Sequence, residues 1–220
     1  MSAVWRVVTL AALLGTPALA GGGPRVATSV LLGGASCQPY IGRVTFGVTP
    51  DAGASREMAR IVALDQAARQ PGQIDWTVVA REDEARRAQT LALLRAGRLS
   101  SAADYFNAAL VFQHGNCPQH YQLAHLLAGQ ALARGAPASG DTLPVGWLFA
   151  ATFDRWQLSL GRPQAYGTQF SNTPDRCEWR LEPVDAVTTD AQRERLGVPA
   201  LGLARAQADI MNARCRGDLP

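Results

Sequence analysis

Between residues 54 and 216, segments with the apolar spacing of an α-helix alternate with prolines and glycines that begin or end them. One segment begins with Ser101 and carries Asp104 three residues later, which is the pattern of a capping box. The next begins at Pro118 and stops at Gly135, with proline in the first turn and glycine after the last. Because such segments follow one another over short connections, we predict a mainly α protein built from antiparallel helical hairpins.

Two regions depart from this helical pattern. Residues 21–53 are rich in Gly, Ser, Thr and Val, and residues 164–184 combine a polar string with the extended-looking sequence CEWRLEPV. We predict short irregular or β segments in both places. The expected organisation is an N-terminal extended segment over 21–53 and one helical domain over 54–216.

The first twenty residues have the pattern of a signal peptide. Arg6 precedes a short apolar run, and Ala18 and Ala20 supply the small residues that signal peptidase recognises. The apolar run is shorter than the roughly 20 residues that a membrane helix needs. We therefore expect cleavage after Ala20, a periplasmic or secreted mature chain, and no membrane insertion after cleavage.

Four cysteines remain in the mature chain, and none forms a C-x-x-C motif. They are Cys37, Cys117, Cys177 and Cys215. An even number of widely spaced cysteines in an exported chain indicates two disulfides. The sequence leaves all three pairings open.

The charged residues exclude several functions. All 21 basic residues are arginine, so lysine-based Schiff-base chemistry and a P-loop lysine are excluded. The arginines are dispersed among 18 acids, whereas nucleic-acid binding needs a clustered basic face. We expect no nucleic-acid partner, and the sequence indicates no cofactor and no metal.

Two aspartates lie at apolar positions of predicted helices. Asp154 falls on the apolar stripe of its helix, and Asp65 does the same in an earlier helix, where Arg69 follows at i+4. A buried carboxylate needs a charged or hydrogen-bonding partner. His114 ends the third predicted helix, so His114, Asp154 and Asp65 form the candidate catalytic cluster.

A dense polar string follows Gly161. The candidate ligand-binding residues are Arg69, Arg155, Gln164, Tyr166, Thr168 and Gln169. If the string is extended, Gln164, Tyr166 and Thr168 share a face. A structural role is the alternative: the string would satisfy the backbone of a buried turn, and Asp154 would pair with Arg69 or Arg155.

Several motifs together resemble an uncharacterised bacterial family of helical domains. They are D-Q-x-x-R at 65–69, Q-H-G at 113–115, D-R at 154–155, G-x-P-Q-x-Y-G-T-Q at 161–169 and L-G-x-P-x-L at 196–201. The resemblance covers roughly residues 58–205 and implies a common helical fold and polar cluster, with no reaction attached. Many relatives have an acid after His-Ala, where this chain has Asn116. Residues 98–135 also resemble a tetratricopeptide or Sel1-type hairpin, although the period is not sustained.

These observations lead to two expectations about function. The first is an exported helical domain that binds or scaffolds a protein, peptide or small-molecule ligand in the cell envelope. The second is a hydrolase-like enzyme in which His114 acts as acid or base and an aspartate orients it. A metal site made of His114, Asp65 and Asp154 is a further alternative.

Overall fold

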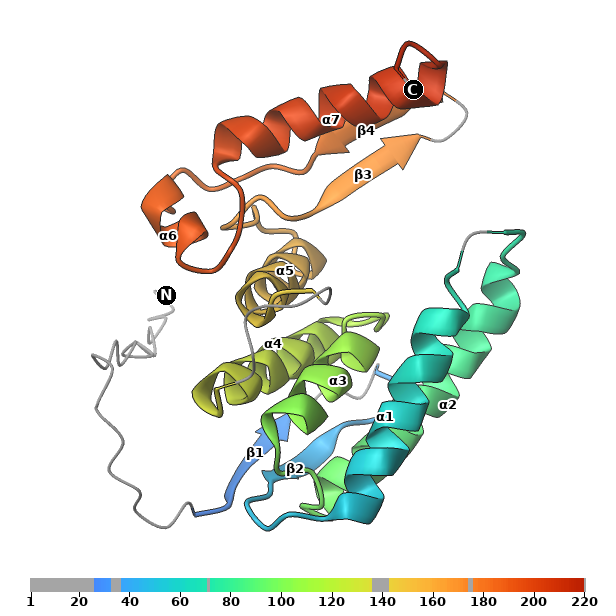
Figure 1. Ribbon diagram of the computed structural model, residues 1–220, viewed down its shortest axis with the longest axis vertical. Helices are drawn as coiled ribbons and strands as arrows, with labels where there is room; N and C mark the ends of the chain where they lie inside the picture. Colours follow the sequence, from blue (N-terminus) through green and yellow to red (C-terminus); the bar gives the residue numbers. More distant parts are fainter. Residues whose placement is uncertain (1–25, 33–36, 71, 136–142, 174–175, 220) are drawn as a thin grey trace, which may run out of the picture.

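The computed structural model describes residues 26–32, 37–70, 72–135, 143–173 and 176–219, and these form a mainly helical fold with two small antiparallel sheets (Figure 1). The predicted fold class is confirmed. The predicted signal peptide, residues 1–20, lies outside the described residues.

The helices are α1 (Ala52–Ala67), α2 (Trp76–Arg95), α3 (Ala102–Phe112), α4 (Pro118–Ala133), α5 (Val145–Ser159), α6 (Asp190–Glu194) and α7 (Leu201–Arg216). The strands are β1 (Thr28–Leu32), β2 (Gly42–Phe46), β3 (Phe170–Thr173) and β4 (Glu178–Leu181). Strand β1 pairs with β2, with Val30 opposite Val44, and β3 pairs with β4, with Asn172 opposite Trp179.

The helix boundaries follow the signals in the sequence. Ser101 and Asp104 form the capping box at the start of α3, where each side chain binds the other residue's backbone N–H. Pro118 is the first residue of α4. Gly97 follows α2 with a φ of 65°, a left-handed conformation that glycine adopts without steric cost.

The main core lies where α1, α3 and α4 pack together, and it includes Tyr105, Phe112 and Leu127. The N-terminal hairpin packs on the same core through buried residues of β2 such as Val44 and Phe46. The described strands of the predicted N-terminal segment therefore contribute to the same core as the helices.

The C-terminal elements lie on the other side of α5 (Figure 1). Helix α7 runs along the β3–β4 hairpin, and the side chain of Asn212 exchanges hydrogen bonds with the backbone of Trp179 in β4. Helix α5 thus lies between the helical core and this outer layer, and it contacts α4 directly.

Two disulfides lie within these layers, one in each. Cys37 bonds to Cys117 at the start of α4, and Cys177 bonds to Cys215 near the end of α7. The predicted number of disulfides is confirmed, and both fit an oxidising compartment. Among the described helices, none has the length and apolar character needed to cross a membrane.

Candidate functional site

The structure brings two of the three predicted catalytic residues together. His114 follows the C-terminal end of α3, and its Nδ1 lies 3.1 Å from both carboxylate oxygens of Asp65, which is buried in the last turn of α1. The His114 side chain is 19% exposed, so the ring reaches solvent. No hydrogen bond from its Nε2 to another described residue is present.

The carboxylate of Asp65 is held by further donors. Gln66 Nε2 donates to Oδ2 at 2.8 Å, and Arg69 Nη1 donates to Oδ1 at 3.1 Å. Arg69 also pairs with Asp83 of α2, which in turn accepts from Arg86 Nη1 at 2.8 Å. This network of alternating charges keeps Asp65 in place and joins α1 to α2.

Two more arginines bind the main chain around His114. Arg87 Nη1 donates to the His114 carbonyl at 2.8 Å, and Arg155 Nη1 donates to the Gln113 carbonyl at 2.7 Å. Burial lowers the pKa of both guanidinium groups, because desolvation disfavours the charged form. Tyr121 also binds this part of the main chain, since its hydroxyl donates to the Gly115 carbonyl at 2.6 Å.

The third predicted catalytic residue, Asp154, has another role. Its Oδ1 accepts from the backbone N–H of Ala165 and Tyr166 at 2.7 and 2.9 Å. Its Oδ2 accepts from the backbone N–H and the hydroxyl of Thr168 at 3.0 and 2.8 Å. Asp154 is fully buried, and in the described part of the chain it makes no ion pair with Arg69 or Arg155. The structure therefore separates Asp154 from the His114–Asp65 pair.

The polar string forms a closed loop and not a strand. Gln164 is buried and donates to the carbonyls of Gln169 and Glu182, while its Oε1 accepts from the Gln169 N–H. Arg193 of α6 donates to the carbonyls of Ala165 and Tyr166. The expected shared face of Gln164, Tyr166 and Thr168 is therefore absent from this region.

One residue of the string is linked through Arg155 to the His114–Asp65 pair, which we call the dyad. Gln169 Oε1 accepts from Arg155 Nε and Nη2 at 3.1 and 2.9 Å, and Arg155 is the side chain that binds the Gln113 carbonyl beside His114. Asp154 fixes the loop, the loop presents Gln169, and Gln169 orients Arg155. The polar string thus supports the site indirectly, by holding Arg155 in place.

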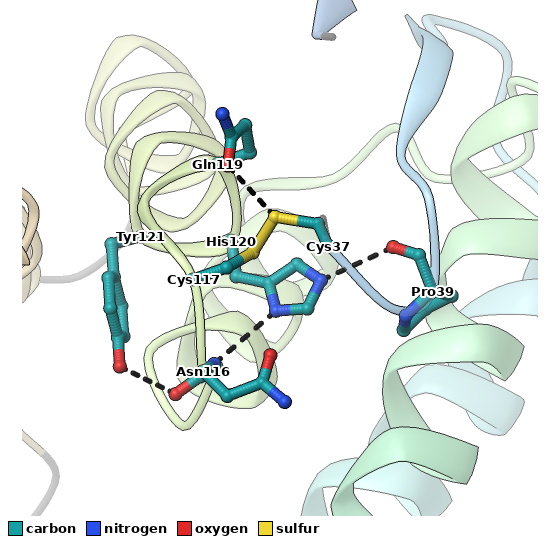
Figure 2. The surroundings of a disulfide bond; sticks show 8 residues. Cys37, Pro39, Asn116, Cys117, Gln119, His120 and Tyr121 are labelled. Carbon is teal, nitrogen blue, oxygen red and sulfur yellow. Dashed lines mark hydrogen bonds between the residues drawn. A yellow bond between two sulfur atoms is a disulfide. The ribbon is translucent and has the colours of Figure 1, made fainter. Parts of the chain in front are cut away.

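The other two histidines are packed. Figure 2 shows the His120 ring beside the Cys37–Cys117 disulfide, with Nε2 directed at the Pro39 carbonyl at 3.3 Å and Nδ1 at the Asn116 N–H. The sulfurs and the ring nitrogens form the one group with metal-ligand spacing among the described residues. Because both sulfurs are in a disulfide, neither is a thiolate that binds metal. His125 binds the Phe149 carbonyl and stacks on its ring.

His120 makes stability depend on pH. Burial, reinforced by the charge of Arg87, lowers the pKa of His120 to about 4, below the unfolded value near 6.5. As pH falls from 6.5 towards 4, the unfolded chain takes up a proton that the folded chain does not, so the free energy of unfolding falls. We expect His120→Gln to remove about 2 kcal/mol of this loss, measured as the slope of unfolding free energy against pH by urea titration. Equal slopes in the two proteins would contradict the assignment.

An apolar cavity of about 460 Å³ lies between α5 and α7, away from the dyad. Trp147 lines it together with Phe170 and Ile210, and Gly167 and Thr168 of the loop form part of its wall. Tyr105 is buried in the core and is not available to such a ligand.

Sequence reasoning missed Arg87, Asp83 and Tyr121. A signal was present for the first two, since the buried positions of α2 are Val79, Asp83, Arg86, Arg87, Thr90, Leu91, Leu93 and Leu94. That i, i+3, i+4, i+7 spacing places the charges of α2 on its core-facing stripe. Tyr121 carries no such signal, because one tyrosine on a predicted helix does not indicate which backbone group it binds.

Comparisons of the whole chain with protein-family models, with curated proteins and with solved structures found no match.

Proposed function

We propose that His114 and Asp65 form the acid–base centre of a hydrolase-like enzyme. The observation that carries this proposal is the contact of Nδ1 with both oxygens of a buried carboxylate, on a ring whose other edge reaches solvent. Asp65 is the positioning residue and His114 the catalytic one.

The geometry supports one tautomer of the neutral His114 ring. Asp65 accepts the Nδ1 proton, so the neutral ring has its lone pair on Nε2, the form needed for a general base. In hydrolysis Nε2 takes a proton from an attacking water, whose oxygen forms the new bond to the substrate. The same nitrogen then gives that proton to the leaving group as its bond breaks. Water is the nucleophile in this scheme, and the four cysteines are all in disulfides.

The proposed location is the periplasm or the extracellular space. Arg6, the apolar run and Ala18-x-Ala20 support export, and two disulfides suit the oxidising compartment that export leads to. Membership of the uncharacterised helical family stays part of the proposal, on the strength of the motifs at 65–69, 113–115 and 161–169.

A binding role is the second proposal, favoured by the apolar cavity between α5 and α7. It has the size of a small-molecule site, it is lined mainly by apolar side chains, and Trp147 offers a flat aromatic surface to a ligand. An apolar small molecule or an apolar peptide side chain suits this lining.

The acid–base proposal predicts that replacing His114 abolishes turnover. The mature chain, with disulfides intact, is assayed on chromogenic esters, amides, phosphate esters and glycosides. We expect His114→Ala to lower kcat/KM by about 10²–10⁴-fold on any substrate that the wild type cleaves. Asp65→Asn is expected to lower kcat by about 10²-fold or more, because the ring loses its fixed tautomer.

His120→Gln is the matched control, since it removes a histidine that does not touch the dyad, and the folded variant is expected to keep wild-type turnover. Nitrogen-15 NMR of the His114 ring gives an independent readout, because the contact with Asp65 requires a proton on Nδ1. Turnover unaffected by His114→Ala, an absence of turnover across the panel, or an Nδ1 without a proton would each reject the proposal.

A further inference from the structure

We propose that the substrate of this site carries an oxyanion, either a carboxylate or a phosphate group. Arg155 binds this oxyanion beside His114, and the buried charge of Arg87 adds to the attraction. The inference rests on the proposed acid–base role of the dyad and adds the chemical class of what the dyad acts on.

The first observation is position. Arg155 comes from α5 and Arg87 from α2, yet their guanidinium groups bind the carbonyls of two adjacent residues, Gln113 and His114. The two cations therefore bind the main chain of His114 and of the residue before it from different helices. Arg69, in the turn after α1, adds a third guanidinium, which donates to Asp65 itself.

The second observation is that the nearby carboxylates already have partners. Asp65 accepts from His114, Gln66 and Arg69, and Asp83 accepts from Arg69 and Arg86. Within the described part of the chain, neither Arg87 nor Arg155 forms an ion pair. The Nε of Arg87, a residue only 2% exposed, has no hydrogen-bond partner among the described residues. Carboxylates such as Asp83 act on Arg87 without touching it. A buried cation with no counter-ion in contact is costly, and a bound anion relieves that cost.

The third observation concerns the donors that Arg155 keeps free. A guanidinium has five N–H groups. Two of those in Arg155 go to Gln169 and one to the Gln113 carbonyl, so among the described residues one N–H on each terminal nitrogen stays unused. Paired donors of this kind suit bidentate binding of a carboxylate or phosphate. Arg155 is partly exposed and Arg87 is not, so the oxyanion meets Arg155.

Arginines at a helix C-terminus also bind its last carbonyls for structural reasons. That role accounts for the contacts with Gln113 and His114. It does not account for Gln169 holding the Arg155 fork in a fixed orientation, nor for two arginines whose only partners are neutral oxygens. A purely structural Arg155 predicts no anion affinity, and this is the difference to measure.

The experiment titrates the nitrogen-15-labelled mature chain with inorganic phosphate and, separately, with acetate at constant ionic strength. Shifts of the Arg155 Nε–H and His114 ring signals give the dissociation constant. We expect saturable millimolar binding of at least one probe, and the probe that binds identifies the oxyanion as phosphate-like or carboxylate. Arg155→Gln is expected to weaken binding by about tenfold or more, which corresponds to the loss of one charge-assisted contact.

Arg162→Gln is the matched control, because Arg162 is exposed just past the end of α5, and it is expected to leave binding unchanged. Arg155→Lys keeps the positive charge but lacks the paired donors of a guanidinium, and we expect it to bind with intermediate affinity. It replaces Arg155→Gln in the test if that variant does not fold. Equal affinity in wild type and an Arg155 variant, or no saturation by either probe, would overturn the proposal.

His114→Asn separates the two proposals. We expect this variant to bind the oxyanion with wild-type affinity while it turns over no substrate. Arg155-dependent binding in a chain that cleaves nothing would refute the acid–base role and leave an anion site. Turnover that depends on His114, without oxyanion binding, would refute the anion site alone.

Discussion

Replacing Asp154 by Asn is expected to lower the free energy of unfolding by about 3 kcal/mol, because two buried donors lose their acceptor. The carboxylate accepts four hydrogen bonds, all from residues 165–168. An asparagine keeps a single oxygen and turns its NH₂ group towards donors. For a chain of this length the melting temperature is expected to fall by about 6–12 °C.

Urea unfolding with intact disulfides measures this effect. Asp209→Asn is the matched control, because Asp209 is exposed on α7, and a change within about 0.5 kcal/mol is expected there. If Asp154→Asn were as stable as the control, the four hydrogen bonds would not fix the loop. Asp154→Asn is also expected to loosen the loop that carries Gln169, which weakens the hydrogen bonds from Arg155 to Gln169.

The local elements of the fold were predictable from sequence because their signals are local. The capping box of Ser101 and Asp104, and Pro118 at the first position of α4, act within a single turn of helix. The packing of the N-terminal hairpin was not predictable. Val44 and Phe46 are buried against helices much later in the chain, and no local pattern in residues 21–53 indicates that contact.

The candidate site was likewise predictable in its local features and not in its long-range contacts. The position of Asp154 on the apolar stripe of its helix predicted burial with a partner from another element, and it is fully buried against the loop that follows α5. The structural alternative paired it with Arg69 or Arg155, because a carboxylate is usually paired with a cation. Backbone N–H groups satisfy a buried carboxylate equally well, and the sequence does not indicate which N–H groups a turn leaves without a partner.

The dyad shows why long-range convergence escapes sequence analysis. Asp65 and His114 each carried a signal of their own, one as a carboxylate on an apolar stripe and the other at a helix end. Their contact joins the ends of α1 and α3, 49 residues apart, and depends on how those helices pack. Arg87 reaches the same place from α2. These side chains form one site only because three helices pack together there.

Removing the Cys37–Cys117 disulfide is expected to have the largest effect on stability, about 4 kcal/mol, because the bond closes a loop of 80 residues in the unfolded chain. The test is urea unfolding of Cys37→Ala/Cys117→Ala against the wild type. Alanine is preferred to serine at 117, since this residue is the N-cap of α4 without a side-chain cap, and a serine there would add about 1 kcal/mol of its own.

The Cys177–Cys215 bond provides the matched comparison. Its loop of 38 residues predicts a similar entropy term, within about 1 kcal/mol of the first. The native contexts differ, however. Cys37 and Cys117 are buried beside His120, whereas Cys215 is exposed in the last turns of α7. Once its bond is removed, that end of α7 is free to fray, which returns entropy to the folded chain. We therefore expect Cys177→Ala/Cys215→Ala to cost less than Cys37→Ala/Cys117→Ala. Equal losses would mean that the end of α7 is held by its packing on β4 as firmly as α4 is held in the core.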